Sequence, residues 1–537
     1  MRGSKRGRSA DRPAWPAGPP RARERAPQLS IVRFAFTLAD MASRTFLAFD
    51  LGAESGRAIA GVFDGAHLEL VEVHRFPNRP VQVGAHVHWD ALALWAEIQA
   101  GLRKAAARFD EIASVGVDTW GVDFALLDAH DALIGNPYHY RDPRTEGMLE
   151  AAFARLPRAR IFEFTGIQFM RINTLYQLLA MVQGGAPALQ IARTFLMMPD
   201  LFHHWLAGCK VCEFTNATTT QCYDPRAGDW ARPMLEALDI PTHVLPPIVP
   251  PGTDLGPLLA SVKRALDEPA ALHRTRVIAP ATHDTGSAVA GVPASSHHFA
   301  YISSGTWSLM GALVRQPVIT PQALQFNFTN EGGVGGTFRL LKNIMGLWLV
   351  QECRRRWSDP SGELLPYAEL FRLAEQAQPF VALIDPDDPT FLSPADMPAA
   401  IADYCRRTDQ RPPADRGAMT RCILESLALK YRYTLDQLQA LLGYPIEVIH
   451  VVGGGSQNAL LCQFTANACS RLVVAGPAEA TALGNLLVQM VASGEIGTLQ
   501  EAGRLAAETA PLASYVPRDA EAWEAAYARF SAIAQAR

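Results

Sequence analysis

Two stretches of the chain repeat one pattern of apolar and polar positions. Residues 44–65, RTFLAFDLGAESGRAIAGVFDG, run from an apolar segment through a polar GAESG bend into a second apolar segment. Residues 298–314, HFAYISSGTWSLMGALV, do the same around an SSGT bend. Short apolar segments joined by Gly-bearing bends are typical of β-hairpins. The repetition therefore predicts two related halves, each opening with a hairpin.

Apolar residues at helical spacing predict two long helices. The first covers residues 89–109, with Asp90 as its expected N-cap. The second covers residues 422–443, and Gly443 is its expected C-terminal stop. The apolar face of this second helix is expected to carry Leu424, Leu427, Tyr431, Leu435, Leu438 and Leu442.

Strands and helices alternate through much of the remaining chain. Residues 446–468 and 471–492 each run from an apolar strand through a Gly-bearing turn into a helix. Residues 112–128 form a predicted strand interrupted by the polar corner DTWG, an arrangement typical of ligand-facing positions. Residues 253–258, TDLGPL, have the composition of a surface connection. This alternation predicts an α/β architecture.

The length of 537 residues is too great for a single hydrophobic core, so several domains are expected. We place the main boundary near residue 295, just before the second hairpin. Residues 1–43 are rich in Arg and Pro and lack a hydrophobic period, so we expect them to be disordered. We expect Met41 to be the true start, because a good strand begins at once after it; a basic targeting arm is the alternative. The predicted segments are a 1–43 extension, a 44–295 N-terminal domain, a 296–520 C-terminal domain and a 521–537 tail helix.

Charge and apolar content disfavour several classes of protein. The net charge of −4 provides no field that would attract nucleic acid. No apolar run approaches the roughly 20 residues that span a bilayer. The eight Cys are too sparse for a disulfide framework. Zinc is the weaker interpretation of Cys209, Cys212 and Cys222, because their spacing does not repeat; buried thiols are the better one. Cys405 and Cys422 flank a short connection and could lie close together.

The two hairpin bends are suited to phosphate groups. Both offer backbone N–H groups and small side chains that let phosphate oxygens come close. Asp50 ends the first strand, where it could hold a water molecule of a Mg²⁺ ion, and Arg57 could complete a phosphate contact. A tight β-turn explains either bend alone, but two bends in matching positions favour a nucleotide.

A triple glycine, Gly453 to Gly455, follows a predicted strand and opens a predicted helix. A nicotinamide site is disfavoured there, because G-x-G-x-x-G fails at Asn458 and no ribose-binding acid follows. We interpret the glycines as a flat backbone against which an adenine or its ribose lies. A plain glycine-rich turn remains the alternative.

Asp284 lies in the stretch PATHDTGSAVAGV, before a run of small residues. It is either the N-cap of a helix or a carboxylate that does chemistry. Adjacent residues at a helix start are not expected to face each other, so a Ser–His–Asp relay through His283 is disfavoured.

Eight segments together resemble the FGGY family of carbohydrate kinases: AFDLGAESGR, GVDTWGVDF, YRDPRT, TNATTTQ, ATHDTGSA, SSGTWSLMG, KNIMGLW and VVGGGSQN. The resemblance runs from about residue 44 to about residue 520. It implies two actin-like (ribonuclease-H-like) ATPase domains with a cleft between them. The sugar site and the base would belong to the N-terminal domain and the nucleotide site to the C-terminal one. DTWGVDF, HDT and SSGTWSLMG are most similar to the branch that phosphorylates L-rhamnulose.

The resemblance also assigns residues by motif. Asp284 matches the catalytic base, and Asp50 remains the candidate Mg²⁺ ligand through water. The sugar-site positions are Gly121, His283, Asp284, Thr285 and Asn343. The ATP positions are Ala53, Glu54, Ser55, Gly56, Arg57, Thr306, Gln351 and Gly454. Glu54 departs from the Ala-Ser-Ser that is more familiar in the family, so we expect the loop to contact ATP through its backbone.

The implied reaction is ATP-dependent phosphorylation of the 1-hydroxyl of L-rhamnulose, with Mg²⁺, in the cytoplasm as part of L-rhamnose catabolism. One alternative is the same chemistry on another ketose, L-fuculose or L-xylulose. Another is a sugar-binding regulator on the same fold, which would usually carry a helix-turn-helix segment that the N-terminal extension does not show. No nucleic acid, membrane or obligate protein partner is expected.

Overall fold

The computed structural model describes residues 43–294, 298–358 and 363–535. The predicted boundary near residue 295 lies outside the described residues, as does the 1–43 extension except for its last residue.

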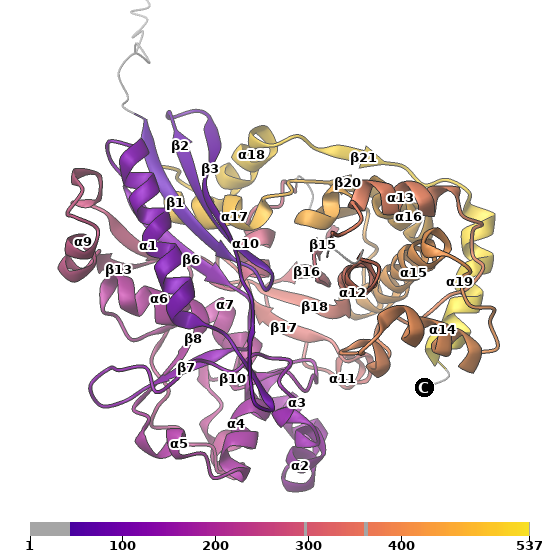
Figure 1. Ribbon diagram of the computed structural model, residues 1–537, viewed down its shortest axis with the longest axis horizontal. Coiled ribbons are helices and arrows are strands. Elements are labelled where there is room, and N and C mark those ends of the chain that lie inside the picture. Colours follow the sequence, from indigo (N-terminus) through magenta and orange to yellow (C-terminus); the bar gives the residue numbers. More distant parts are fainter. Residues whose placement is uncertain (1–42, 295–297, 359–362, 536–537) are drawn as a thin grey trace, which may run out of the picture. The chain divides into compact units, whose positions relative to one another are not determined.

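A six-stranded mixed sheet forms the first half of the described chain (Figure 1). Its strands, in spatial order, are β13 (Thr253–Pro257), β14 (Arg276–Ala279), β6 (Ser114–Thr119), β1 (Arg44–Leu51), β2 (Ser55–Phe63) and β3 (Leu68–Pro77). β1, β6 and β14 run parallel, whereas β2, β3 and β13 each pair antiparallel with a neighbour. The first predicted hairpin is therefore confirmed as β1 and β2.

A seven-stranded mixed sheet forms the second half. Its strands, in spatial order, are β17 (Thr329–Gly332), β18 (Phe338–Met345), β16 (Trp307–Val314), β15 (Phe299–Ser304), β19 (Val448–Val452), β20 (Leu472–Ala475) and β21 (Ala513–Tyr515). β15, β19 and β20 run parallel, and the other pairs are antiparallel. The second predicted hairpin is confirmed as β15 and β16.

The two sheets share one topology. In each, an N-terminal hairpin is followed by a third antiparallel strand on one side and by two parallel strands, then an antiparallel edge strand, on the other. β1, β2, β3, β6 and β14 of the first sheet thus correspond in place and direction to β15, β16, β18, β19 and β20 of the second. The edge strands β13 and β21 hold matching places but differ in chain order, since β13 precedes β14 whereas β21 follows β20. The prediction of two related halves is confirmed by this order.

Helices cover both faces of each sheet (Figure 1). α1 (Ala91–Arg108) and α6 (Met198–Ala207) pack on one face of the first sheet, and α17 (Ala480–Ala492) packs on the other. The second sheet carries α12 (Trp348–Arg356), α15 (Arg416–Leu442), α16 (Ala459–Cys469) and α19 (Ala520–Gln535) on one face. α10 (Asp284–Ala290) packs on its other face and crosses α17.

α17 belongs to the second half in sequence but completes the core of the first. Its residues Leu483, Leu486 and Leu487 are buried against Phe46 and Ile59 of the first sheet. Each such leucine contributes about 1.5–3 kcal/mol when removed from water. Gly484 permits the crossing with α10, because a Cβ there would lie 1.8 Å from the carbonyl oxygen of Ser287.

The remaining elements complete the two halves. Four two-stranded sheets pair β4 (Val81–Val83) with β5 (His86–His88), β7 (Phe124–Leu127) with β8 (Thr194–Met197), β9 (Cys212–Glu213) with β12 (Ile248–Val249), and β10 (Tyr223–Asp224) with β11 (Asp229–Trp230). The other α-helices are α2 (Met148–Arg155), α3 (Arg158–Thr165), α4 (Thr174–Gln183), α5 (Pro187–Ile191), α7 (Phe214–Ala217), α8 (Arg232–Ala237), α9 (Ala260–Ala265), α11 (Pro321–Phe326), α13 (Tyr367–Gln376), α14 (Met397–Arg407) and α18 (Leu499–Thr509).

Helix ends follow the predicted caps. Asp90 accepts a hydrogen bond from Ala93 N at the start of α1, and Gly443 ends α15 in the left-handed conformation, with φ 75°. α15 begins six residues earlier than predicted, because the side chain of Asp415 caps it. The prediction for residues 253–258 is wrong: they contain edge strand β13. The strand carries a bulge between Asp254 and Gly256, and its residues, TDLGP, are of the kinds common in loops.

The cysteines that the sequence singled out are free thiols. Cys212 and Cys222 are buried free thiols as predicted, whereas Cys209 is partly exposed. The thiols of Cys405 and Cys422 share a hydrogen bond, so these two residues do lie together.

In the ranges that the structure describes, no helix has the length and apolar character to cross a membrane.

Candidate active site

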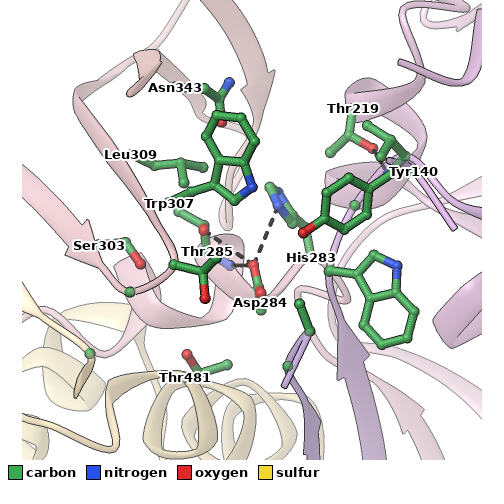
Figure 2. A pocket seen from close by; sticks show the side chains of 18 of the residues that line it. Tyr140, Thr219, His283, Asp284, Thr285, Ser303, Trp307, Leu309, Asn343 and Thr481 are labelled. Atoms are coloured by element: carbon green, nitrogen blue, oxygen red, sulfur yellow. Dashed lines mark hydrogen bonds and ion pairs between the residues drawn. The ribbon is translucent and has the colours of Figure 1, made fainter. Parts of the chain in front are cut away.

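The two hairpin bends line a common cavity of about 330 Å³ (Figure 2). From the first half it is lined by the β1–β2 bend, the corner after β6 and the start of α10. From the second half it is lined by the β15–β16 bend, β18, α12 and the glycine turn after β19. All predicted site residues except one line it: Asp50, Ala53, Glu54, Ser55, Arg57, Gly121, His283, Asp284, Thr285, Thr306, Asn343, Gln351 and Gly454.

Gly56 is the exception, and its expected place at the ATP site is not supported by the cavity. It belongs to strand β2, where a Cβ would lie 2.3 Å from the ring of Phe76. This glycine therefore allows an aromatic side chain to pack beneath the bend.

Asp284 is the first residue of α10, and 30% of its side chain is exposed. The N-cap of α10 is His283, so the interpretation of Asp284 as the N-cap is wrong by one residue. Oδ1 of Asp284 accepts hydrogen bonds from N and Oγ1 of Thr285, at 2.5 and 3.2 Å. Burial raises the pKa of Asp284 above its ordinary value, His283 opposes the rise, and Asp50 adds to it. The result is a fixed carboxylate with increased basicity, facing the cavity.

His283 and Asp284 do face each other, contrary to the expectation from their adjacency. Nε2 of His283 lies 3.4 Å from Oδ1 of Asp284, a contact drawn in Figure 2. The segment before them is fixed by the buried carboxylate of Glu213. That carboxylate accepts hydrogen bonds from N and Oγ1 of Thr282, at 3.0 and 2.8 Å. The main-chain N of His283 donates to Oγ1 of Thr215. The loop that carries both residues is therefore held from behind.

Gly121 and Val122 form the polar corner after β6. Val122 has φ 67°, a strained conformation for a β-branched residue, and strain of this kind costs roughly 1–3 kcal/mol. Its N–H donates to Oγ1 of Thr219 at 3.0 Å, and its carbonyl accepts from Oγ1 of Thr174 at 2.6 Å. Gly121 packs against Thr219, where a Cβ would lie 3.0 Å from that side chain. Strain held so firmly is typical of functional sites.

Asp123 holds the aromatic wall beside this corner. Its buried carboxylate accepts hydrogen bonds from Trp89 Nε1 at 2.6 Å, Trp120 Nε1 at 3.0 Å, Tyr140 N at 3.1 Å and Gln177 Nε2 at 2.9 Å. Burial raises the pKa of Asp123 to about 6, although the side-chain donors of Trp89, Gln177 and Trp120 act against the rise. Trp120 and Tyr140 both line the cavity. Asp123 thus fixes two walls of the site without touching the cavity itself.

Asn343 on β18 is held by Gln168, a cavity residue that the sequence did not single out. Oε1 of Gln168 accepts from N and Nδ2 of Asn343 at 2.8 and 3.1 Å, and its Nε2 donates to the carbonyl of Asn343 at 3.2 Å. Because the two residues come from opposite halves, these bonds join the halves at the cavity. No periodicity or motif marks Gln168.

The side chain of Glu54 points to Arg355 on α12, with which it forms an ion pair across the two halves. In the same region, the buried Oε1 of Gln351 has no hydrogen-bond partner among the described residues. At the glycine turn, a Cβ on Gly455 would lie 2.0 Å from Oγ of Ser304. This close approach joins the triple glycine to the β15–β16 bend.

Asp50 and Arg57 form a partly buried ion pair at the first bend. Nε and Nη2 of Arg57 donate to Oδ2 of Asp50 at 2.9 and 2.7 Å, and Nη1 lies 2.8 Å from Oε2 of Glu479. Among the described residues, no three His, Cys, Asp or Glu side chains are grouped to hold a metal directly. Asp50, Glu54, Asp284 and Glu331 all line the cavity without forming such a group. This lining suits an ion that keeps its waters and is held mainly by phosphates, as Mg²⁺ usually is.

Residues 45–291 match the FGGY family of carbohydrate kinases, N-terminal domain, and residues 300–493 match its C-terminal domain. The chain belongs to the FGGY family of carbohydrate kinases. It is therefore a kinase enzyme, and the family expected from the sequence motifs is confirmed.

Several curated proteins are similar over nearly the full chain. Rhamnulokinase from Bacteroides thetaiotaomicron is 47% identical over 487 residues, which cover 91% of this chain and 99% of that protein. Rhamnulokinase from Pectobacterium atrosepticum is 43% identical, covering 92% and 97%. Rhamnulokinase from Halalkalibacterium halodurans is 41% identical, covering 88% and 99%.

Solved structures of sugar kinases share the fold. A gluconate kinase from Lactobacillus acidophilus aligns with a TM-score of 0.76 at 17% identity, over 92% of this chain and 98% of that one. A ligand-bound xylulose kinase from Lactobacillus acidophilus aligns with a TM-score of 0.74 at 17% identity, over 92% and 98%. At such identity the likeness concerns the fold alone, and it confirms the predicted two-domain α/β class.

Proposed function

We propose that this chain transfers the γ-phosphoryl group of ATP to the 1-hydroxyl of L-rhamnulose, giving L-rhamnulose 1-phosphate and ADP in L-rhamnose catabolism. The observation that carries the proposal is the 47% identity, over 91% of the chain, to a protein named rhamnulokinase. The cavity supports it, because it joins two phosphate-type bends to an aspartate of raised pKa.

The nucleotide would lie between the two bends. Backbone N–H groups of Ala53 to Ser55 and the bend at Thr306 would receive the phosphates, while Gln351 and Gly454 would contact the rest of the nucleotide. Phosphoryl transfer passes through a loose transition state, so positioning and charge neutralisation provide most of the catalysis. Asp50 would hold Mg²⁺ through water, and the ion would offset charge on the β- and γ-phosphates when bound.

The ketose would lie against the first half. Gly121, His283, Thr285 and Asn343 would orient its hydroxyls, and a sugar that lacks one hydroxyl would leave a buried polar group unpaired. Asp284 would take the proton of the 1-hydroxyl as that oxygen attacks the γ-phosphorus. A positioned general base of this kind contributes about 10²–10⁴ in rate. The raised pKa of Asp284 favours this role.

A ketose panel tests the proposal. Purified protein receives Mg-ATP with L-rhamnulose, L-fuculose or L-xylulose, and ADP release is measured. We expect the largest kcat/KM with L-rhamnulose and a sugar 1-phosphate as product. A higher kcat/KM with another ketose would overturn the substrate. ADP release that no ketose stimulates would overturn the kinase reaction and favour a sugar-binding regulator.

A further inference from the structure

The Nδ1 side of His283 contacts a buried ion pair, whose glutamate, Glu331, also lines the cavity. Arg339 on β18 is fully buried, and 5% of the side chain of Glu331 on β17 is exposed. Nη2 of Arg339 lies 3.2 Å from Oε2 of Glu331. Replacing a buried ion pair by apolar residues is often neutral for stability or stabilising. The pair is therefore better explained by its effect on His283 than by its effect on folding.

Hydrogen-bond geometry fixes which ring nitrogen carries the proton. Nη2 of Arg339 contacts Nδ1 of His283 at 3.0 Å, and its Nε donates to the carbonyl of Gly332 at 2.7 Å. A guanidinium has only donors, so Nδ1 must be the unprotonated acceptor. Oε2 of Glu331 lies 3.3 Å from the same Nδ1 but has no aligned hydrogen bond among the described residues.

The proton of the neutral ring then belongs to Nε2, the atom 3.4 Å from Oδ1 of Asp284. We propose that Arg339, balanced by Glu331, is a positioning residue that holds His283 as the neutral Nε2–H tautomer. His283 then offers the cavity a hydrogen-bond donor and leaves Asp284 as the only proton acceptor of the pair. The role in catalysis rests on the proposed function, whereas the tautomer does not.

The charged groups around His283 explain why holding its ring in the neutral Nε2–H tautomer affects the site. Asp284, on α10, lies at Nε2 of the ring, and Glu331 and Arg339, on β17 and β18, lie at Nδ1. Tyr301 on β15 interacts with the Arg339–Glu331 pair, and Asp50 acts on Asp284 from β1. The ring nitrogens thus lie 3.4 and 3.3 Å from the carboxyl groups of Asp284 and Glu331. An imidazolium would neutralise Asp284 and weaken it as a base, and the guanidinium at Nδ1 prevents this.

The first test reads the tautomer and needs no substrate. Full-length protein labelled with ¹⁵N-histidine is examined by long-range ¹H–¹⁵N correlation spectroscopy near neutral pH. The signals of His283 are identified by their loss in His283→Gln. We expect one protonated and one unprotonated nitrogen, with the proton on Nε2. A proton on Nδ1, or on both nitrogens, would overturn the proposal.

The second test measures how the ketose kcat/KM depends on pH. Arg339→Met frees Nδ1 and leaves Glu331 unbalanced beside it, so His283 takes a proton more readily. The acid limb should move to higher pH by about one unit or more. Arg339→Met with Glu331→Gln removes both charges, so most of this movement should disappear.

Arg421→Met is the matched control. Arg421 is another largely buried arginine, and its Nε lies 2.7 Å from Oε1 of Glu425. Neither of these two residues lines the cavity. It should leave the acid limb in place. An unmoved limb in Arg339→Met, or an equal movement in the double variant, would overturn the proposal. If the wild type shows no ketose-dependent ADP release, the proposed function fails while the spectroscopic test still decides the tautomer.

Discussion

Replacing Asp123 by Asn removes a buried negative charge while keeping the size of the side chain. The carboxylate of Asp123 is surrounded by four N–H donors, from Trp89, Trp120, Tyr140 and Gln177. Burial nevertheless raises its pKa to about 6, from an ordinary value of 3.8. The contribution of Asp123 to the free energy of unfolding therefore depends on pH. Asn cannot reproduce this dependence, because its amide does not titrate.

The direction in which the contribution of Asp123 to the free energy of unfolding changes with pH depends on which state, folded or unfolded, holds the proton. Below about pH 4 both folded and unfolded protein carry it on Asp123, and well above pH 6 neither does. Between these values only the folded protein does, so the contribution of Asp123 to the free energy of unfolding falls as pH rises. A pKa difference of about two, at ~1.4 kcal/mol per unit, gives about 3 kcal/mol. The difference between wild type and Asp123→Asn should change by this amount across the window.

Urea unfolding followed by tryptophan fluorescence measures this difference. Trp89 and Trp120, which both bond to Asp123, contribute to this signal together with the other tryptophans of the chain. Wild type and variant are compared at several pH values between about 4 and 7.5. Asp110→Asn, at an exposed position, is the control and should show no such change. A wild-type minus variant difference that stays constant with pH would refute the reasoning.

Three further perturbations test the site. Asp284→Asn should lower kcat by ~10² or more while ATP still binds, measured by ADP release and ATP titration; an unchanged kcat would assign proton transfer to another group. Gly484→Ala should destabilise the protein by about 1–3 kcal/mol, because its Cβ meets the carbonyl of Ser287, and a wild-type melting temperature would contradict this. A double-mutant cycle of Glu54→Ala and Arg355→Ala should give a coupling of about 0.2–1 kcal/mol that high salt abolishes. Zero coupling at low salt would show that the ion pair does not form in solution.

Local sequence patterns were enough to predict the parts of the fold that depend on local physics. The two hairpins and the cap at Asp90 follow from short-range alternation and side-chain chemistry, and the structure has them where predicted. The motifs also placed Asp284 and Asn343 correctly at one cavity, although the chain separates them by 59 positions. Their assigned roles in the reaction remain predictions.

Residues that hold the side chains of the site in place carried no signal in the sequence. Arg339 and Glu331 belong to strands whose alternation predicts only which face each side chain takes, not that His283 lies opposite. Asp123 directly follows a recognised corner, but its four donors come from segments up to 54 positions away. Such contacts depend on tertiary packing, which periodicity does not encode. Edge strand β13 was missed for the opposite reason, since its local composition is that of a loop.

The position of α17 in the chain has a consequence during protein synthesis. The ribosome completes β14 at Ala279 about 200 residues before it finishes the helix that covers the neighbouring sheet face. At ~5–20 residues per second, this takes about 10–40 s. Throughout that interval Phe46 and Ile59 lack the leucines that bury them in the folded chain. The nascent first half therefore exposes an apolar sheet face of the kind that chaperones bind, and a fragment that stops at residue 291 would keep that face uncovered.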